Sequence, residues 1–423
     1  MRLSPRWAAI LLAGALAGCA QMAAPDARVP GAETPARLDI DVLCSEIRDR
    51  YVYFDARAGH WDAACANAAG QAETADTLVA QIAVVERLLD DLYDPHINLG
   101  TNTRASPRLV PSGSDLWFEN AGGQFVVAAV RPGSGAARAG VALGDALVRF
   151  NGLSPEALWQ SRIHTPSNPL PAARTSWALN AAIAGRYDAP RRLEVRRGGA
   201  VLAFDLADPM PAQAASPVTA DILPGRIGYI RFNNSLGADE TVAAFDDALE
   251  TLRGTAGLIL DLRDTPSGGN TGVAEPILGR LVAALAPYQV AVYPGGREAQ
   301  AQITPRGPWT YGAPIIALCG RWTGSMGEGM VIGLDGTRRA KVMGSAMAGL
   351  AGGTEPLVLP QSGLTVWLPT YDLRHLDGTP RHQWMPGAGA EPGDFRADFG
   401  DGRDMLLARA RRALAGHESR AEP

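Results

Sequence analysis

The stretch from Pro314 to Gly344 constrains the fold most, because it predicts a buried strand, a turn, a helix and a second strand in direct succession. The apolar run Ile315–Leu318 suits the first strand, and Gly320 with Thr323–Gly324 marks the turn. Ser325 then stands where the helix begins, among unpaired N–H groups at the positive end of the helix dipole. Such a serine is either a helix cap or a nucleophile whose oxyanion these groups stabilise, and this stretch alone favours the cap.

Other segments add to this pattern. Thr323-Gly324-Ser325-Met326-Gly327-Glu328 resembles the T-x-S-x-x-E nucleophile segment of the S41 peptidases, which are the C-terminal (tail-specific) processing proteases and their tricorn-like relatives. Three more segments resemble motifs of this family in the same order: Arg226–Phe232, Gly257–Arg263 with Gly268-Gly269-Asn270, and Gly389-Ala390-Glu391-Pro392. The resemblance runs from about Leu38 to Pro392. It implies a fold of the α/β (α+β) class, with a Clp/crotonase-like ββα core, a PDZ-like β domain and a small N-terminal helical domain.

The chain begins with a charged segment, a short apolar run and Leu16-Ala17-Gly18-Cys19. The apolar run suits a secretory signal and is too short for a transmembrane helix. The L-A-G-C ending resembles the bacterial lipobox, which implies cleavage before Cys19, a lipid on its thiol, and a periplasmic protein anchored to the outer membrane. An ordinary signal peptide with a coincidental cysteine is the alternative. The expected parts are a signal at 1–18, a tether at 19–36, the helical domain at 37–104, the PDZ-like domain at 111–208 and the protease core at 217–415.

Three cysteines remain after Cys19. Cys44 and Cys65 lie in one small helical region, so in an oxidising periplasm a disulfide between them is as plausible as two buried thiols. Cys319, at the end of the strand before Ser325, reads as a core residue rather than a second nucleophile.

The helical domain is expected to end at a candidate base. Leu78, Ile82, Val85, Leu89 and Leu92 recur at helical spacing, which predicts an amphipathic helix that Pro95 stops. His96 therefore lies on the loop that leaves this helix. A loop histidine is more often a surface or capping residue, but in tricorn-like S41 members the histidine at this place is the general base.

Residues 139–152 follow a strand, Phe125–Val130, and resemble the bacterial PDZ signature. PDZ domains take an extended peptide as an added strand and hold its terminal carboxylate, which implies protein or peptide partners. A PDZ-like module that only packs against the core is the alternative.

The resemblance and the chemistry of the residues suggest how Ser325 would act. Adjacent glycines let backbone N–H groups approach a ligand, so Gly268 or Gly269, together with Met326, is expected to bind the oxyanion. Tail-specific members use a lysine as base, but Leu350 stands at that step and Lys341 is expected to face solvent. His96 is the better base, and activity would then rise with pH through the neutral range. Three carboxylates are left as candidates to orient its ring: Asp94, Glu328 and Glu391.

The sequence thus predicts a lipid-anchored periplasmic serine endopeptidase that cleaves peptides or protein C-terminal tails. The alternative is a catalytically inactive S41-like protein that binds tails without cleaving them, because the family's lysine and the tricorn-like glutamate, replaced here by Pro386, are missing. A crotonase-like acyl-CoA enzyme would suit the core but conflicts with the export signal. No ligand cluster or phosphate loop suggests a metal or organic cofactor. The net charge of −5, without a basic stripe, argues against nucleic-acid binding.

Overall fold

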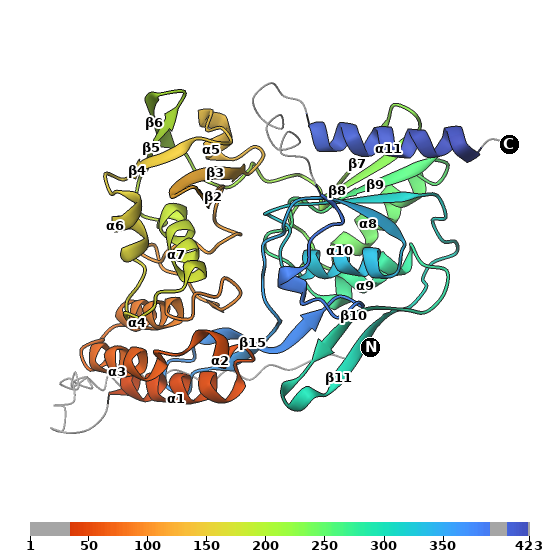
Figure 1. Cartoon of the computed structure of the whole chain (residues 1–423). Helices are drawn as coiled ribbons and strands as arrows, with labels where there is room; N and C mark the ends of the chain where they lie inside the picture. Colours follow the sequence, from red (N-terminus) through yellow and green to blue (C-terminus); the bar gives the residue numbers. More distant parts are fainter. Residues whose placement is uncertain (1–33, 390–403, 422–423) are drawn as a thin grey trace, which may run out of the picture.

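The computed structural model describes residues 34–389 and 404–421 and has three regions, seen in Figure 1 as the helices in red and orange, a β region in yellow, and a larger α/β core in green and blue. The predicted signal, Cys19 and Glu391 lie outside the described residues. Within the described ranges, no helix is long and apolar enough to cross a membrane.

The N-terminal region consists of four helices: α1 (Pro35–Arg50), α2 (Phe54–Arg57), α3 (Trp61–Ala72) and α4 (Leu78–Asp90). A disulfide joins Cys44 on α1 to Cys65 on α3, which settles that open question. The predicted stripe is buried at Ile82, Val85, Leu89 and Leu92, whereas Leu78 is 51% exposed. The helix also ends earlier than Pro95 requires, because the backbone turns after Asp90 and Tyr93 adopts a left-handed φ of 39°.

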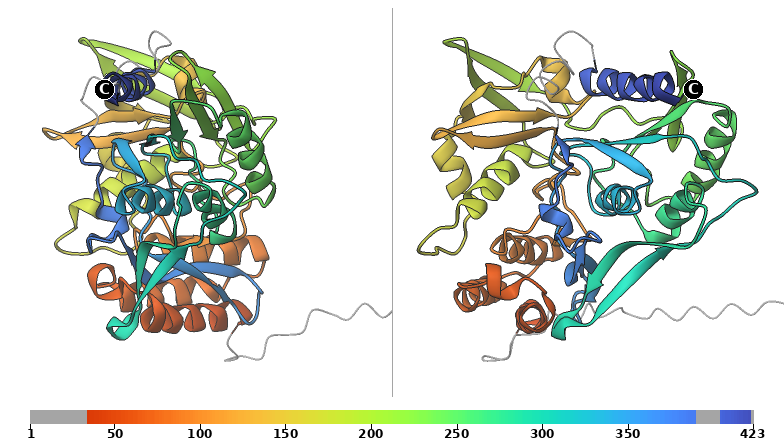
Figure 2. Two further views of the ribbon diagram at one scale, coloured as in Figure 1. Left: turned by 90° about the vertical axis from the view of Figure 1, so that its right-hand side faces the viewer. Right: turned by 45° about the vertical axis from the view of Figure 1, so that its right-hand side comes forward.

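The helices share their hydrophobic core with strands from the other end of the chain. Leu357, Leu364, Val366 and Leu368 pack among the buried residues of α1, α3 and α4. They come from or adjoin a sheet in the order β1 (Asn98–Leu99), β15 (Thr365–Arg374), β10 (Ala286–Val292) and β11 (Glu298–Ile303), with β14 (Gly353–Val358) also pairing with β15. Figure 2 shows the blue strands of this sheet beside the red and orange helices, with the teal hairpin of β10 and β11 next to them. The residues after His96 are therefore fastened to the core through β1.

The middle region is a five-stranded antiparallel sheet in the order β2 (Leu116–Ala121), β3 (Gln124–Val130), β4 (Ala146–Phe150), β5 (Arg191–Arg197) and β6 (Ala200–Leu206). Three helices accompany it: α5 (Gly135–Ala139), α6 (Pro155–Gln160) and α7 (Ala172–Ala184). The predicted strand at 125–130 is confirmed as β3, and Gly140 takes the left-handed φ of 85° that ends α5. The PDZ-like identity of this region stays a prediction.

The core is a six-stranded sheet in the order β16 (Ala388–Gly389), β13 (Ala340–Gly344), β12 (Ile315–Cys319), β9 (Gly257–Asp261), β8 (Ile227–Phe232) and β7 (Val218–Leu223). All neighbours are parallel except β7 and β8. Strands β9 and β12 are buried along their whole length, as continuous apolar runs in a covered parallel sheet should be.

Helices cover both faces of this sheet. On one face pack α8 (Glu240–Thr251), α9 (Thr271–Gly279) and α10 (Met326–Gly336), and on the other packs α11 (Met405–Ala421), as Figure 1 shows. Two short 3-10 turns complete the elements, η1 (Pro294–Gly296) and η2 (Arg381–Gln383). The expected mixed α/β class is confirmed. The segments that follow β9 and β12 lie at the carboxyl edge of parallel strands, where Ser325 and the glycine pair meet.

Candidate active site

Ser325 occupies a strained turn between β12 and α10. Its φ of 48° and ψ of −111° lie far from the extended conformation that capping residues use. A non-glycine residue in such a region costs on the order of 1–3 kcal/mol and persists only where its surroundings impose it. A sharp, strained strand-to-helix turn also exposes the nucleophilic serine at the top of the sheet in α/β-hydrolases. The conformation therefore argues against a simple cap.

His96 stands beside this serine, with Nε2 3.0 Å from Oγ of Ser325. The other ring nitrogen, Nδ1, lies 2.7 Å from the carbonyl oxygen of Ala351. A carbonyl only accepts hydrogen bonds, so Nδ1 must hold the proton in the neutral ring. Nε2 is then left with a lone pair directed at the serine hydroxyl. This is the tautomer that a general base for Ser325 requires.

The surroundings keep His96 neutral over a wide pH range. Its side chain is buried, and burial, followed by the positive charge of Arg381, lowers its pKa to about 4. The expectation that this histidine titrates in the neutral range is therefore wrong. The physical reason is that a buried imidazolium next to an arginine loses hydration and meets a like charge.

Asp94 and Glu328, two of the carboxylates expected to orient the ring of His96, bind other groups instead. Asp94 accepts the backbone N–H of His96 at 2.9 Å and the hydroxyl of Tyr51 at 2.6 Å, so it shapes the loop. Glu328 is fully buried and accepts the N–H groups of Ser325, Gly349 and Leu350 at 2.8, 3.0 and 3.1 Å. Burial raises its pKa to about 7, against the lowering effects of Arg381 and these three donors. A peptide carbonyl, rather than Asp94 or Glu328, holds the imidazole.

The glycine pair follows β9 and reaches Ser325. Gly268, with a φ of 66°, lies so close that a Cβ on it would sit 2.4 Å from Cβ of Ser325. Its own N–H donates to the carbonyl of Thr265 at 3.0 Å. Within the described part of the chain, the N–H groups of Gly269 and Met326 have no acceptor. Of the two glycines, Gly269 is therefore the one whose N–H is free to bind an oxyanion.

The two positions weighed as alternative bases behave differently. Lys341 is exposed on β13, as expected, and so does not reach into the site. Leu350 is buried and offers no proton acceptor in its side chain, but its loop delivers the carbonyl of Ala351 to His96.

Two groups that contact His96 or its surroundings could not be predicted from sequence motifs. The carbonyl of Ala351 is a backbone group, so no side-chain motif could predict its contact with His96. Arg381 begins the short 3-10 turn η2 outside any predicted motif, yet it is 2% exposed and donates to the carbonyls of Leu350 and Gly352 at 2.9 and 2.8 Å. Only the fold brings these residues together.

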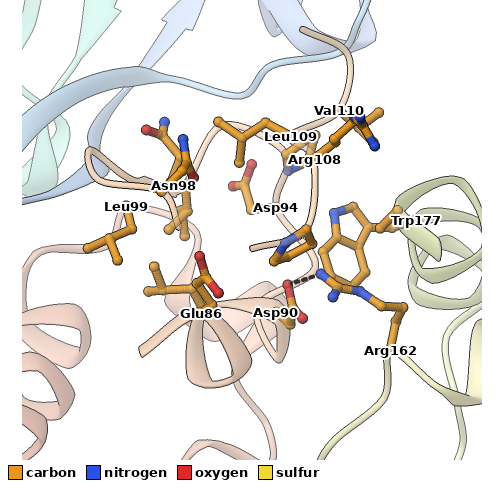
Figure 3. Close-up of a pocket in the computed structure, with 16 residues that line it drawn as sticks. Glu86, Asp90, Asp94, Asn98, Leu99, Arg108, Leu109, Val110, Arg162 and Trp177 are labelled. Carbon is orange, nitrogen blue, oxygen red and sulfur yellow. Dashed lines mark hydrogen bonds and ion pairs between the residues drawn. The ribbon is translucent and has the colours of Figure 1, made fainter. Parts of the chain in front are cut away.

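Ion pairs tie the loop that holds His96 to the middle region. Asp90, at the end of α4, pairs with Arg162 at 2.7 Å, and Asp91 pairs with the buried Arg174 at 2.5 Å. Figure 3 shows the first pair at the edge of a pocket of about 60 Å³. A larger cavity of about 570 Å³ also begins at this loop, at Pro95, and its walls are mainly aromatic and polar side chains from all three regions, among them Tyr53, Arg57, Tyr93, Trp117, Trp177 and His382.

A strained serine, a histidine of fixed tautomer 3.0 Å from it, and two N–H groups without an acceptor among the described residues form an arrangement like that of serine hydrolases. Residues 226–392 match the model of peptidase family S41. This match agrees with the resemblance to S41 peptidases that the sequence motifs predicted for this part of the chain.

Solved structures show the same fold over most of the chain. Mature CPAF is 12% identical, and the match covers 91% of this chain and 98% of that one with a TM-score of 0.62. The photosystem II D1 C-terminal processing protease is 17% identical, and the match covers 88% of this chain and 100% of that one with a TM-score of 0.54. No curated protein sequence matches the chain.

Proposed function

We propose that this protein is a serine endopeptidase in which Ser325 is the nucleophile and His96 the base. The observation that carries the proposal is the contact of 3.0 Å between Nε2 of His96 and Oγ of Ser325, with Nδ1 committed to a carbonyl. The match of residues 226–392 to the model of peptidase family S41 supports peptide bonds as the target.

The chemistry follows from the geometry. Oγ of Ser325 attacks the scissile carbonyl while its proton passes to Nε2 of His96. The N–H groups of Gly269 and Met326 stabilise the oxyanion, and His96 then gives the proton to the leaving amine. A water molecule, deprotonated by the same nitrogen, then attacks the acyl-enzyme. As the ester bond breaks, His96 gives this proton to Oγ of Ser325 and the free serine is restored. Every proton transfer in this cycle goes through Nε2 of His96. The tautomer with the proton on Nδ1 is therefore needed, because it leaves Nε2 free to accept a proton.

We further propose that the substrates are peptides or protein C-terminal tails, and that a lipid on Cys19 anchors the enzyme to a membrane facing the periplasm. The lipobox-like Leu16-Ala17-Gly18-Cys19 supports the anchor, and the Cys44–Cys65 disulfide is consistent with an oxidising compartment. Labelling cells with a clickable fatty acid tests the anchor. Equal labelling and membrane retention of Cys19→Ala protein would rule it out.

A fluorophosphonate probe, which reacts with activated serines, tests the catalytic proposal on the purified chain. We expect labelling of wild type and its loss in Ser325→Ala, with peptide hydrolysis lost in parallel. Ser345→Ala is a matched control, because Ser345 is a partly exposed serine on the loop after β13 and its hydroxyl donates to the carbonyl of Ala346. An unlabelled, folded wild type that still binds peptides would instead favour an inactive tail-binding protein.

A further inference from the structure

The loop from Gly349 to Gly352 is held by buried side chains on two sides. Glu328, on α10, accepts the N–H groups of Gly349 and Leu350 at 3.0 and 3.1 Å. Arg381, on η2, donates from one Nη2 atom to the carbonyls of Leu350 and Gly352 at 2.9 and 2.8 Å. Ala351 lies between Leu350 and Gly352 in the sequence, and its carbonyl is the acceptor for Nδ1 of His96.

We propose that Arg381 is a positioning residue: by holding the carbonyls on both sides of Ala351, it keeps the Ala351 carbonyl on Nδ1 of His96 and thereby fixes the tautomer that serves Ser325. The role of this tautomer in hydrolysis rests on the function proposed above. The positioning itself does not, because it is a property of the hydrogen bonds around His96.

The chemistry of arginine suits this task. The guanidinium is planar and always charged, and its N–H directions are fixed, so one nitrogen can serve two carbonyls at once. Arg381 is 2% exposed, and its hydrogen bonds among the described residues go to the carbonyls of Leu350 and Gly352. A buried arginine whose hydrogen bonds go only to carbonyls is costly unless the structure requires the group.

The same charge acts on the imidazole. After burial, Arg381 is the main cause that lowers the pKa of His96, whereas Asp94 raises it. Removal of the guanidinium should therefore raise the pKa of His96. The charged and titratable groups in this neighbourhood come from the loop of His96, from α10, α2, β15 and η2, and they are Asp94, Glu328, Arg57, Asp372, Arg381 and His382.

Nitrogen-15 NMR of the full chain, labelled at its six histidines and assigned for His96 with His96→Gln, reads the tautomer without any need for activity. We expect wild type to show a single neutral form with the proton on Nδ1 down to about pH 5, because its pKa is about 4. In Arg381→Met we expect a mixture of both neutral tautomers and a titration moved to higher pH. Arg381→Lys should keep most of the low pKa but not the single tautomer, because an ammonium is not a planar fork.

Arg339→Met is the matched control. Arg339 is also a partly buried arginine that donates to backbone carbonyls, those of Leu281, Tyr311 and Ala313, and it does not touch the loop of Ala351. It should lower stability but leave the His96 spectrum unchanged. Where Arg381→Met does not fold, Arg381→Gln replaces it with the same reading. An unchanged tautomer and titration in a folded Arg381 variant would overturn the proposal.

Hydrolysis gives an independent reading. We expect Arg381→Met to lower kcat about a hundredfold with a smaller change in KM, as misplacement of a catalytic group does. An inactive wild type with the predicted NMR changes would refute the peptidase proposal and leave the positioning role standing. Normal activity in wild type and in Arg381→Met, with an unchanged His96 spectrum, would do the reverse.

Discussion

The turn at Ser325 and the edge of strand β2 differ in whether their backbone hydrogen-bonding groups have partners. At the turn beside Ser325, the N–H groups of Gly269 and Met326 have no acceptor among the described residues. At the edge strand β2, the side chain of Asn180 on α7 takes both groups of Phe118, accepting its N–H at 2.8 Å and donating to its carbonyl at 3.0 Å. The turn at Ser325 thus leaves backbone donors unpaired, whereas at Phe118 a side chain of the same protein occupies the hydrogen-bonding groups of the strand edge.

The difference indicates where this molecule meets a substrate. An added peptide strand needs unpaired backbone groups on a sheet edge, and at Phe118 these are already used. Open N–H groups at the start of a helix, next to a nucleophile, are instead what a developing oxyanion needs. The comparison supports a catalytic core that binds substrate and a middle region that, at this position, only packs.

The largest effect is expected from the two catalytic side chains. Ser325→Ala and His96→Ala should each abolish hydrolysis almost completely, with a loss of up to about a millionfold in kcat, because neither residue works without the other. The double variant should be hardly worse than either single one. Steady-state hydrolysis of a fluorogenic peptide measures this. A His96→Ala enzyme within about tenfold of wild type would show that another group is the base.

Gly268→Ala should cost about a hundredfold in kcat/KM, because the new Cβ, 2.4 Å from that of Ser325, must displace the nucleophile. Gly363→Ala is the control, since Gly363 has a similar φ of 69°, against 66° at Gly268, but nothing within 4 Å of its Cβ position. Both variants pay for a strained backbone, and only the first meets Ser325. Equal activity in the two would mean that contact with Gly268 does not position the serine.

The pH dependence of kcat/KM should show two steps on the acid side. Near pH 7, Glu328 takes a proton and can no longer accept all three N–H groups that it holds. Near pH 4, His96 takes a proton and stops acting as base, so activity is present above this pKa and lost below it. Glu328→Gln should remove the upper step and keep the lower one. A single step near pH 6.5 that survives this substitution would show that His96 titrates as an ordinary histidine.

The sequence predicted the elements of the core well and the contacts of the site only in part. The apolar run Ile315–Leu318 identified β12, and the turn before Ser325 located the start of α10, because these signals are local. The resemblance to family motifs indicated the segments that form β8 and β9. The sequence left three carboxylates as candidates to orient His96 and could not indicate the carbonyl of Ala351, because every residue has a backbone carbonyl. The end of α4 was also misplaced, because a turn at Tyr93 precedes the proline.

A smaller effect is expected at the closed edge. Asn180→Leu leaves the N–H and the carbonyl of the fully buried Phe118 without partners, which should lower the free energy of unfolding by about 1–3 kcal/mol for each unpaired group. Urea unfolding measures the loss, and hydrogen exchange at Phe118 should accelerate. Asn67→Leu, at an exposed position on α3, should change stability little. A neutral Asn180→Leu would mean that the edge is not closed by this side chain.

The smallest effect is expected at Lys341. Tail-specific members of the family rely on a lysine as base, so the one lysine of this chain is the residue that could still challenge His96. Lys341 is exposed on β13, where it pairs in register with Ile316 rather than reaching Ser325. Lys341→Ala should therefore keep kcat within about twofold, and stability within about 0.5 kcal/mol, as surface substitutions usually do. A folded but inactive Lys341→Ala enzyme would move the base away from His96 and make the fixed imidazole tautomer a structural feature without a catalytic role.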